Sequence, residues 1–121
     1  MSEAADSILE ALRASGLAYP GARSRAPWPD HDDLAVNGKT FAYLPVAGQP
    51  FSLSAKLPYT GEVALQLPYA KPTAYGLGKS GWVTFTPSEE EMPSFDQLRD
   101  WIDESYRAQA PKKLVRELDS R

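Results

Sequence analysis

Apolar residues recur at helical spacing near both ends of the chain. Residues 3–16 are predicted to form a helix, because Ile8, Leu9 and Leu12 would share one face of it. A second helix is predicted from about 95 to 110, and its apolar face would carry Leu98, Trp101, Ile102 and Ser105. The pattern places one amphipathic helix at each end of the molecule.

Turn and cap residues indicate where these helices stop and start. Gly16 is suited to end the first helix, because glycine adopts the left-handed conformation that often follows a last turn. Ser94 and Gln97 match a capping box at the start of the second helix, and Pro111 ends it. The segment KKLVREL after this proline is expected to add a final turn.

Between the helices the apolar spacing changes to alternation. Phe51, Leu53, Ala55 and Leu57 alternate with Ser52, Ser54 and Lys56, which predicts a half-buried strand. Earlier in the chain, Asn37-Gly38 lies between two short apolar runs, Leu34 with Val36 and Phe41 with Tyr43. Asn-Gly in this setting is a strong hairpin signal, because both turn residues need a positive φ.

The remaining segments carry weaker signals. An edge strand is predicted near residues 22–28, since prolines surround it and proline is confined to sheet edges. A short helix is predicted around 61–67, and a second hairpin pairs residues 72–77 with 82–86. Gly76, Gly78 and Gly81 would make the loop of this hairpin tight or mobile.

The order of these elements defines the expected fold. It is an α+β fold, with a mostly antiparallel sheet of about five strands packed against N- and C-terminal helices. The 121 residues are expected to form a single domain over 1–121. The other face of the sheet should be partly open to water.

Composition restricts the chemistry. The chain has no cysteine, which excludes disulfides, thiolate metal sites and cysteine nucleophiles. No basic region leads into an apolar run at the start, and no apolar run is long enough to span a bilayer, so a cytoplasmic location without a membrane partner is expected. The formal net charge is -3, but residues 21–86 carry six bases and four acids.

Four segments, in order, resemble the MmcQ/YjbR family. They are Pro20-Gly21 with Pro27-Trp28; Val36 to Ala42; Tyr75-Gly76-Leu77-Gly78-Lys79-Ser80-Gly81-Trp82; and the spacing of Leu98, Ile102, Ser105 and Tyr106. In the third segment Tyr75, Lys79 and Trp82 match the family pattern. Glycine replaces the two histidines and the asparagine of that pattern.

The resemblance implies a fold similar to the frataxin/CyaY arrangement. It also implies DNA binding, since the family is commonly described as DNA-binding, with a "double wing" formed by its hairpins. The lost histidines argue against a polar role for the third segment here.

The same hairpin carries the candidate site. Lysine can neutralise phosphate and aromatic rings can stack on bases, so we expect a nucleic-acid surface at Lys71, Tyr75, Lys79 and Trp82. Arg23, Arg25 and Lys39 are expected to extend it. The alternative is that Tyr75 and Trp82 pack on the sheet while the lysines keep its edge soluble, and for Trp82 this alternative is favoured.

No enzyme, cofactor or metal site is expected. His31 is the single histidine and lies in a polar turn, where a solvated role is predicted. The acids of the first helix, Glu3, Asp6 and Glu10, have ordinary solvent-face spacing, which argues against iron. The run Glu89-Glu90-Glu91 is expected to favour the N-terminus of the second helix.

Two functions therefore remain. The first is a non-catalytic module that binds DNA weakly and with strong salt sensitivity. The second is a protein-interaction module without nucleic-acid binding. The sequence does not indicate an oligomeric state.

Overall fold

The computed structural model describes residues 3–26 and 29–121, so Pro27 and Trp28 lie outside it. In chain order the elements are α1 (Glu3–Leu17), β1 (Ala22–Arg25), β2 (Asp33–Val36), β3 (Lys39–Ala42), β4 (Leu53–Lys56), α2 (Gly61–Ala64), β5 (Ala70–Pro72), the 3-10 helix η1 (Leu77–Ser80), β6 (Trp82–Phe85), α3 (Phe95–Gln109) and α4 (Lys112–Asp119). None of the described helices is long and apolar enough to cross a membrane.

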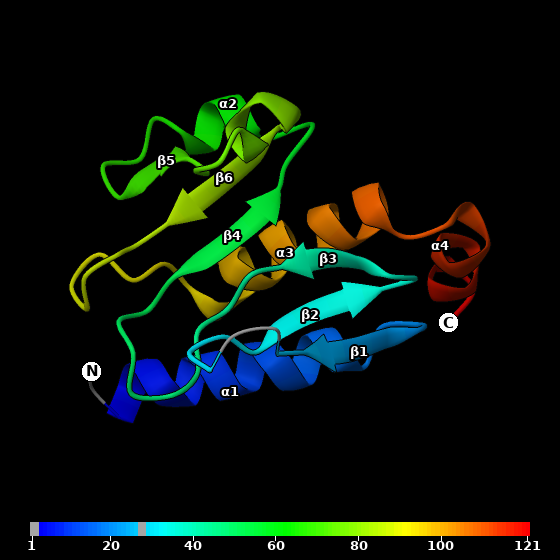
Figure 1. The fold of residues 1–121 in the computed structure, drawn as a ribbon, viewed down its shortest axis with the longest axis horizontal. Helices are drawn as coiled ribbons and strands as arrows, with labels where there is room; N and C mark the ends of the chain where they lie inside the picture. The colour runs from blue at the N-terminus through cyan, green and yellow to red at the C-terminus, as the bar shows by residue number, and fades with distance from the viewer. Residues whose placement is uncertain (1–2, 27–28) are drawn as a thin grey trace.

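The strands form two antiparallel sheets of three strands each, in the orders β1-β2-β3 and β4-β6-β5. The Tyr43 and Ser54 backbones join them, because each N–H donates to the other carbonyl, at 3.0 and 3.1 Å. The continuous order is therefore β1-β2-β3-β4-β6-β5, with α1 and α3 behind the strands (Figure 1). The α+β class is confirmed, with six strands instead of about five.

Aromatic rings fill the space between the strands and α3. Phe85 of β6 stacks on Trp101 with ring centroids 3.9 Å apart, and Phe41 of β3 meets Tyr106 edge to face at 5.2 Å. The Tyr106 hydroxyl donates to the Pro20 carbonyl at 2.6 Å, so this buried polar group has a partner. The core lies on the helix side of the sheet, and the opposite face has no helix over it (Figure 1).

The local predictions at the first hairpin and the long helix are confirmed. Asn37 and Gly38 have φ values of 50° and 77°, as a two-residue hairpin turn requires. The Ser94 hydroxyl accepts the Gln97 N–H at 3.1 Å and caps α3. The Glu89–Glu91 run precedes α3, as expected, and Glu91 accepts the Ser88 N–H at 2.9 Å within its own turn.

Several boundaries differ from the predictions. Gly16 does not end the first helix in a left-handed conformation, because α1 runs to Leu17 and Gly16 has no positive φ. Strand β5 ends at Pro72 instead of 77, because residues 73–81 turn through Gly76 and Gly81, both at positive φ, and form η1. Helix α2 covers 61–64 instead of 61–67. The final turn predicted after Pro111 is an eight-residue helix, α4, since its Leu114, Val115 and Leu118 pack against the core.

Candidate nucleic-acid interface

Charge is divided between the two layers of the molecule. The six strands carry five bases, Arg23, Arg25, Lys39, Lys56 and Lys71, and a single acid, Asp33. Helices α1 and α3 carry seven acids and three bases, a net charge of -4. An anionic ligand is therefore favoured on the sheet side and repelled from the helix side.

The strand register places Lys71 on the open face of the sheet. Phe85 points to the core and stacks on Trp101, so its neighbour Thr84 points away from the helices. Lys71 and Ser54 both lie directly opposite Thr84, in the strands on either side of β6. Side chains of directly opposed residues share a face, so Lys71 points away from the helices as well.

The loop after β5 folds back onto that strand and brings Lys79 near Lys71. The Gly78 N–H donates to the Thr73 carbonyl at 3.0 Å. A Cβ at Gly78 would lie 2.6 Å from the Pro72 Cβ, so glycine is needed for this close approach. Lys71 and Lys79, the sequence neighbours of Pro72 and Gly78, are both exposed.

Tyr75 lies in the turn between these two lysines. Its side chain is fully exposed, at 101%, and its backbone has a φ of 60°. A positive φ is uncommon for a bulky residue and costs on the order of 1–2 kcal/mol. The ring buries nothing that would offset this cost, so the fold gains little from a tyrosine at this position.

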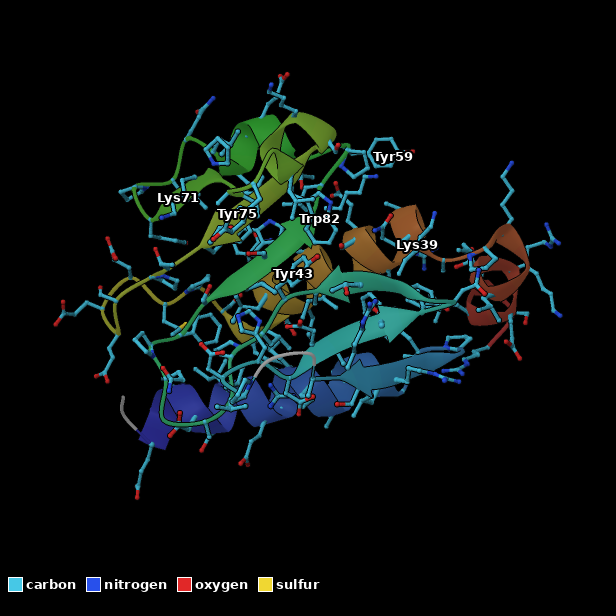
Figure 2. The ribbon with its side chains drawn as sticks, in the orientation of Figure 1. Lys39, Tyr43, Tyr59, Lys71, Tyr75 and Trp82 are labelled. Atoms are coloured by element: carbon cyan, nitrogen blue, oxygen red, sulfur yellow. The ribbon has the colours of Figure 1, made fainter. Side chains whose placement is uncertain are left out.

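Trp82 does not belong to the exposed surface. It is 5% exposed, and its ring centroid lies 5.2 Å from that of Tyr43 (Figure 2). This burial agrees with the alternative favoured for Trp82, packing on the sheet, because neighbouring side chains already cover the indole. Tyr43 and Trp82 are instead part of the packing of the open face.

Tyr59 is an exposed aromatic that the sequence analysis missed. It is 88% exposed and precedes α2 (Figure 2). Glu104 of α3 holds this turn, because its Oε2 accepts the N–H groups of Tyr59 and Thr60 at 2.9 and 3.1 Å. Tyr59, Glu62, Lys79 and Trp82 are among the residues that line an open groove of about 540 Å³ between α2 and η1.

Two groups of predicted site residues lie at opposite edges of the sheet. Lys71 is in β5, at one end of the strand order, while Arg23 and Arg25 are in β1, at the other end. Five strand-to-strand steps of about 4.8 Å separate these edges by roughly 24 Å. Lys39, at the β2–β3 turn, lies nearer the β1 edge. We call Lys71, Tyr75 and Lys79 the hairpin surface, and it excludes the two arginines and Lys39.

His31 and Asp33 form a polar cluster at the start of β2. His31 is partly buried, which differs from the solvated role predicted for it. Its backbone forms an isolated antiparallel β-bridge with Pro45, and its Nδ1 lies 3.2 Å from Asp33 Oδ1. Asp33 is 1% exposed; its Oδ1 accepts the Leu44 N–H at 2.9 Å, while its Oδ2 has no partner among the described residues. Burial raises the pKa of the Asp33 carboxyl above its usual value.

Asp33 should make the stability of the protein depend on pH. A carboxyl whose pKa is raised by folding stabilises the folded state below the unfolded pKa, near 4, and loses that contribution as pH rises through the folded pKa. Asp33→Asn keeps the acceptor for Leu44 and removes the charge. We expect its free energy of unfolding to exceed that of the parent at pH 7, with the difference shrinking toward pH 4.

Urea denaturation of both proteins at several pH values measures this difference. A difference that stays constant from pH 4 to pH 7 would show that Asp33 titrates alike in the folded and unfolded chains.

The cluster has no sign of a metal site: over residues 3–26 and 29–121, no group of three or more His, Cys, Asp or Glu residues could hold a metal ion.

Comparisons with known proteins agree with this architecture. A family model described as YjbR matches residues 17–108. The crystal structure of protein DR2400 from Deinococcus radiodurans, a DUF419 domain, is similar with a TM-score of 0.67 and 24% sequence identity, over 81% of this chain and 75% of that one. No curated protein has a matching sequence.

Proposed function

Since the chain belongs to the YjbR family, we propose that it is a non-catalytic module that binds DNA through the hairpin surface. The observation that carries this proposal is Tyr75, which is fully exposed and has a positive φ. A residue held in an unfavourable conformation without burial is most simply explained by contact with a ligand. Stacking on a base is what an exposed tyrosine ring between two lysines offers.

The layered charge supports the same orientation of the ligand. The sheet side carries the bases of the strands, and the helix side has a net charge of -4 in α1 and α3. DNA that approaches the hairpin surface therefore meets Lys71 and Lys79 and stays away from the acidic helices. The net negative charge of the protein should keep its affinity for DNA low, and this affinity should fall as the salt concentration rises.

The absence of catalysis is part of the proposal. Asp33, whose raised pKa would suit an acid-base catalyst, is 1% exposed and lines none of the grooves beside β1, α2 or the 86–92 loop. The groove that contains Lys79 is open to solvent. Glu62 and Lys79 line it together with apolar residues. Its residues suit contact with a ligand better than enclosure of a reaction.

Binding of a fluorescein-labelled oligonucleotide, followed by anisotropy at 50 and 200 mM KCl, tests the function. Two or three phosphate contacts predict an affinity about 10- to 40-fold weaker at the higher salt concentration. Single-stranded and duplex DNA are compared, because stacking by Tyr75 favours unpaired bases. If neither form binds at 50 mM KCl or below, DNA binding is excluded.

A protein partner is the second candidate function. Val63 and Leu65 of the α2 segment are 70% and 37% exposed, and they lie near Tyr59 in sequence. Exposed apolar residues grouped in this way are common at protein interfaces. This candidate becomes the better one if the DNA titration is negative and Val63→Asp abolishes binding to a partner isolated with the parent protein.

A further inference from the structure

The β1 edge of the sheet carries a second groove, with a volume of about 600 Å³. Arg23 and Arg25 line it from the strand, and Asn37 and Gly38 line it from the neighbouring hairpin turn. Leu114 of α4 closes another side, and a Cβ at Gly21 would lie 3.0 Å from its Cδ1. We call this hollow the β1 groove.

The strand register directs both arginines toward the open face. Arg23 and Arg25 lie opposite Ala35 and Asp33. Leu34 and Val36, the residues that alternate with these two, belong to the core, so Arg23 and Arg25 point away from it. Arg25 is partly positioned already, since its guanidinium donates to the Gly38 carbonyl at 3.2 Å.

The surroundings of the groove are basic. Exposed bases on α4 and the hairpin turn add to the two arginines: Lys39, Lys112, Lys113 and Arg116. The nearby acids are largely engaged. Asp119 pairs with Arg107 at 2.9 Å, and Asp32 pairs with Arg13 at 3.2 Å. Asp33, opposite Arg25, is buried and accepts the Leu44 N–H through Oδ1 alone, and Glu117 makes no ion pair among the described residues.

We propose that the β1 groove is a second, phosphate-binding site, distinct from the hairpin surface. A guanidinium presents a planar fork of donors that matches two phosphate oxygens, and an arginine pair on one strand face provides two such forks. Asn37 also lines the groove, and an asparagine side chain carries further donors. The hairpin surface instead offers two lysines, which act as point charges beside a stacking ring.

The phosphate could come from a DNA backbone or from a free phosphate ester, and the DNA source rests on the function proposed above. The two sites are roughly 24 Å apart, at the opposite edges of six strands. At about 3.4 Å per base pair, one duplex reaches both sites only if it is longer than about 7 base pairs. If the phosphate belongs to DNA, duplexes longer than about 7 base pairs should therefore bind at both sites, while shorter ones should not. If it belongs to a free phosphate ester, no such dependence on duplex length is expected.

Arg23→Ala is the variant that tests the site, and Arg99→Ala is its matched control. The Arg23 side chain is exposed and makes no hydrogen bond or ion pair with the described residues, so its truncation should not disturb the fold. Arg99 lies on α3, in the acidic layer, about 4.0 Å from Asp96. Backbone amide signals of the parent are followed by NMR while inorganic phosphate replaces chloride at constant ionic strength.

Signals of residues 21–25 and 37–38 are expected to shift with phosphate in the parent and in Arg99→Ala, and not in Arg23→Ala. DNA of about 5 and about 20 base pairs is then titrated by anisotropy at 50 and 200 mM KCl. If the phosphate belongs to DNA, Arg23→Ala loses one phosphate contact with the longer duplex. The drop in its affinity between 50 and 200 mM KCl should then be roughly 3.5-fold smaller than the drop for the parent. The Arg99→Ala variant behaves as the parent.

The outcomes separate the two proposals. Phosphate shifts without any DNA binding would exclude the proposed function and leave the β1 groove as a site for a free phosphate ester. Phosphate shifts together with DNA binding that Arg23→Ala leaves intact would also assign the groove to a free source. If phosphate moves none of these signals and Arg23→Ala binds the long duplex as Arg99→Ala does, the second site is excluded.

Discussion

Trp82→Ala is expected to lower the free energy of unfolding by about 3–5 kcal/mol. The indole is 5% exposed, packs against Tyr43 and belongs to the central strand of the β4-β6-β5 sheet, so its loss leaves a large cavity. Urea denaturation monitored by circular dichroism measures the change. This effect should be the largest of any substitution in the third segment of the family resemblance.

Tyr59→Ala is the control for that experiment. Tyr59 is also aromatic and lies at the same end of the molecule, but it is 88% exposed, so its truncation should change stability by no more than about 0.5 kcal/mol. A Trp82→Ala protein that is as stable as the parent yet binds DNA poorly would contradict the structural role. It would restore Trp82 as a contact of the ligand.

Tyr75→Gly is expected to weaken DNA binding without weakening the fold. Stacking of one base on an aromatic ring contributes roughly 1–3 kcal/mol, so the dissociation constant should rise about 5- to 150-fold. Glycine adopts the φ of 60° found at this position more readily than tyrosine, and the exposed ring stabilises no contact in the core. Stability should therefore be equal to that of the parent or higher.

The aromatic control is Tyr75→Phe, which retains the ring and should bind DNA nearly as the parent does. Anisotropy titrations at 50 mM KCl compare the three proteins, and urea denaturation follows their stability. If Tyr75→Gly and the parent bind DNA equally, the exposed ring is not a contact. If Tyr75→Gly is less stable, the positive φ at this position is stabilised by the tyrosine itself.

Local sequence signals predicted much of the fold because their physical cause is local. Asn37-Gly38 can form a tight turn on its own, and the Ser94 cap depends on a backbone N–H three residues away. The long apolar face of α3 needed no knowledge of its partner. The end of β5 was misplaced because Gly76 and Gly81 turn the chain earlier than the apolar pattern indicated.

The candidate site was harder to predict because it depends on contacts between distant segments. Tyr59 is positioned by Glu104, 45 residues further along the chain. Trp82 is covered by Tyr43, from the segment after β3, which the sequence did not place beside it. Arg23 and Lys71 belong to the same net-positive region of the sequence, but the strand order separates them by the full width of the sheet.

Alternation along the last strand does not by itself separate the candidate residues. Alternation makes Trp82, Thr84 and Thr86 one face of the last strand and Val83 with Phe85 the other. The structure adds that hydroxyls occupy the open face, where Thr84 lies 2.8 Å from both Ser54 and Thr73, oxygen to oxygen. Trp82 shares this face with Lys71, and its contact with Tyr43, from a distant segment, is what buries it.

The salt dependence of DNA binding by the parent and by Lys71→Ala/Lys79→Ala tests the central claim most directly. Each phosphate contact contributes about 0.9 to the slope of log affinity against log salt concentration, so the double variant should lower the slope by about 1.8. Its thermal stability should match that of the parent, since both lysines are exposed. An unchanged slope in the double variant would show that DNA is bound elsewhere, and a parent without salt-dependent binding would exclude the nucleic-acid function.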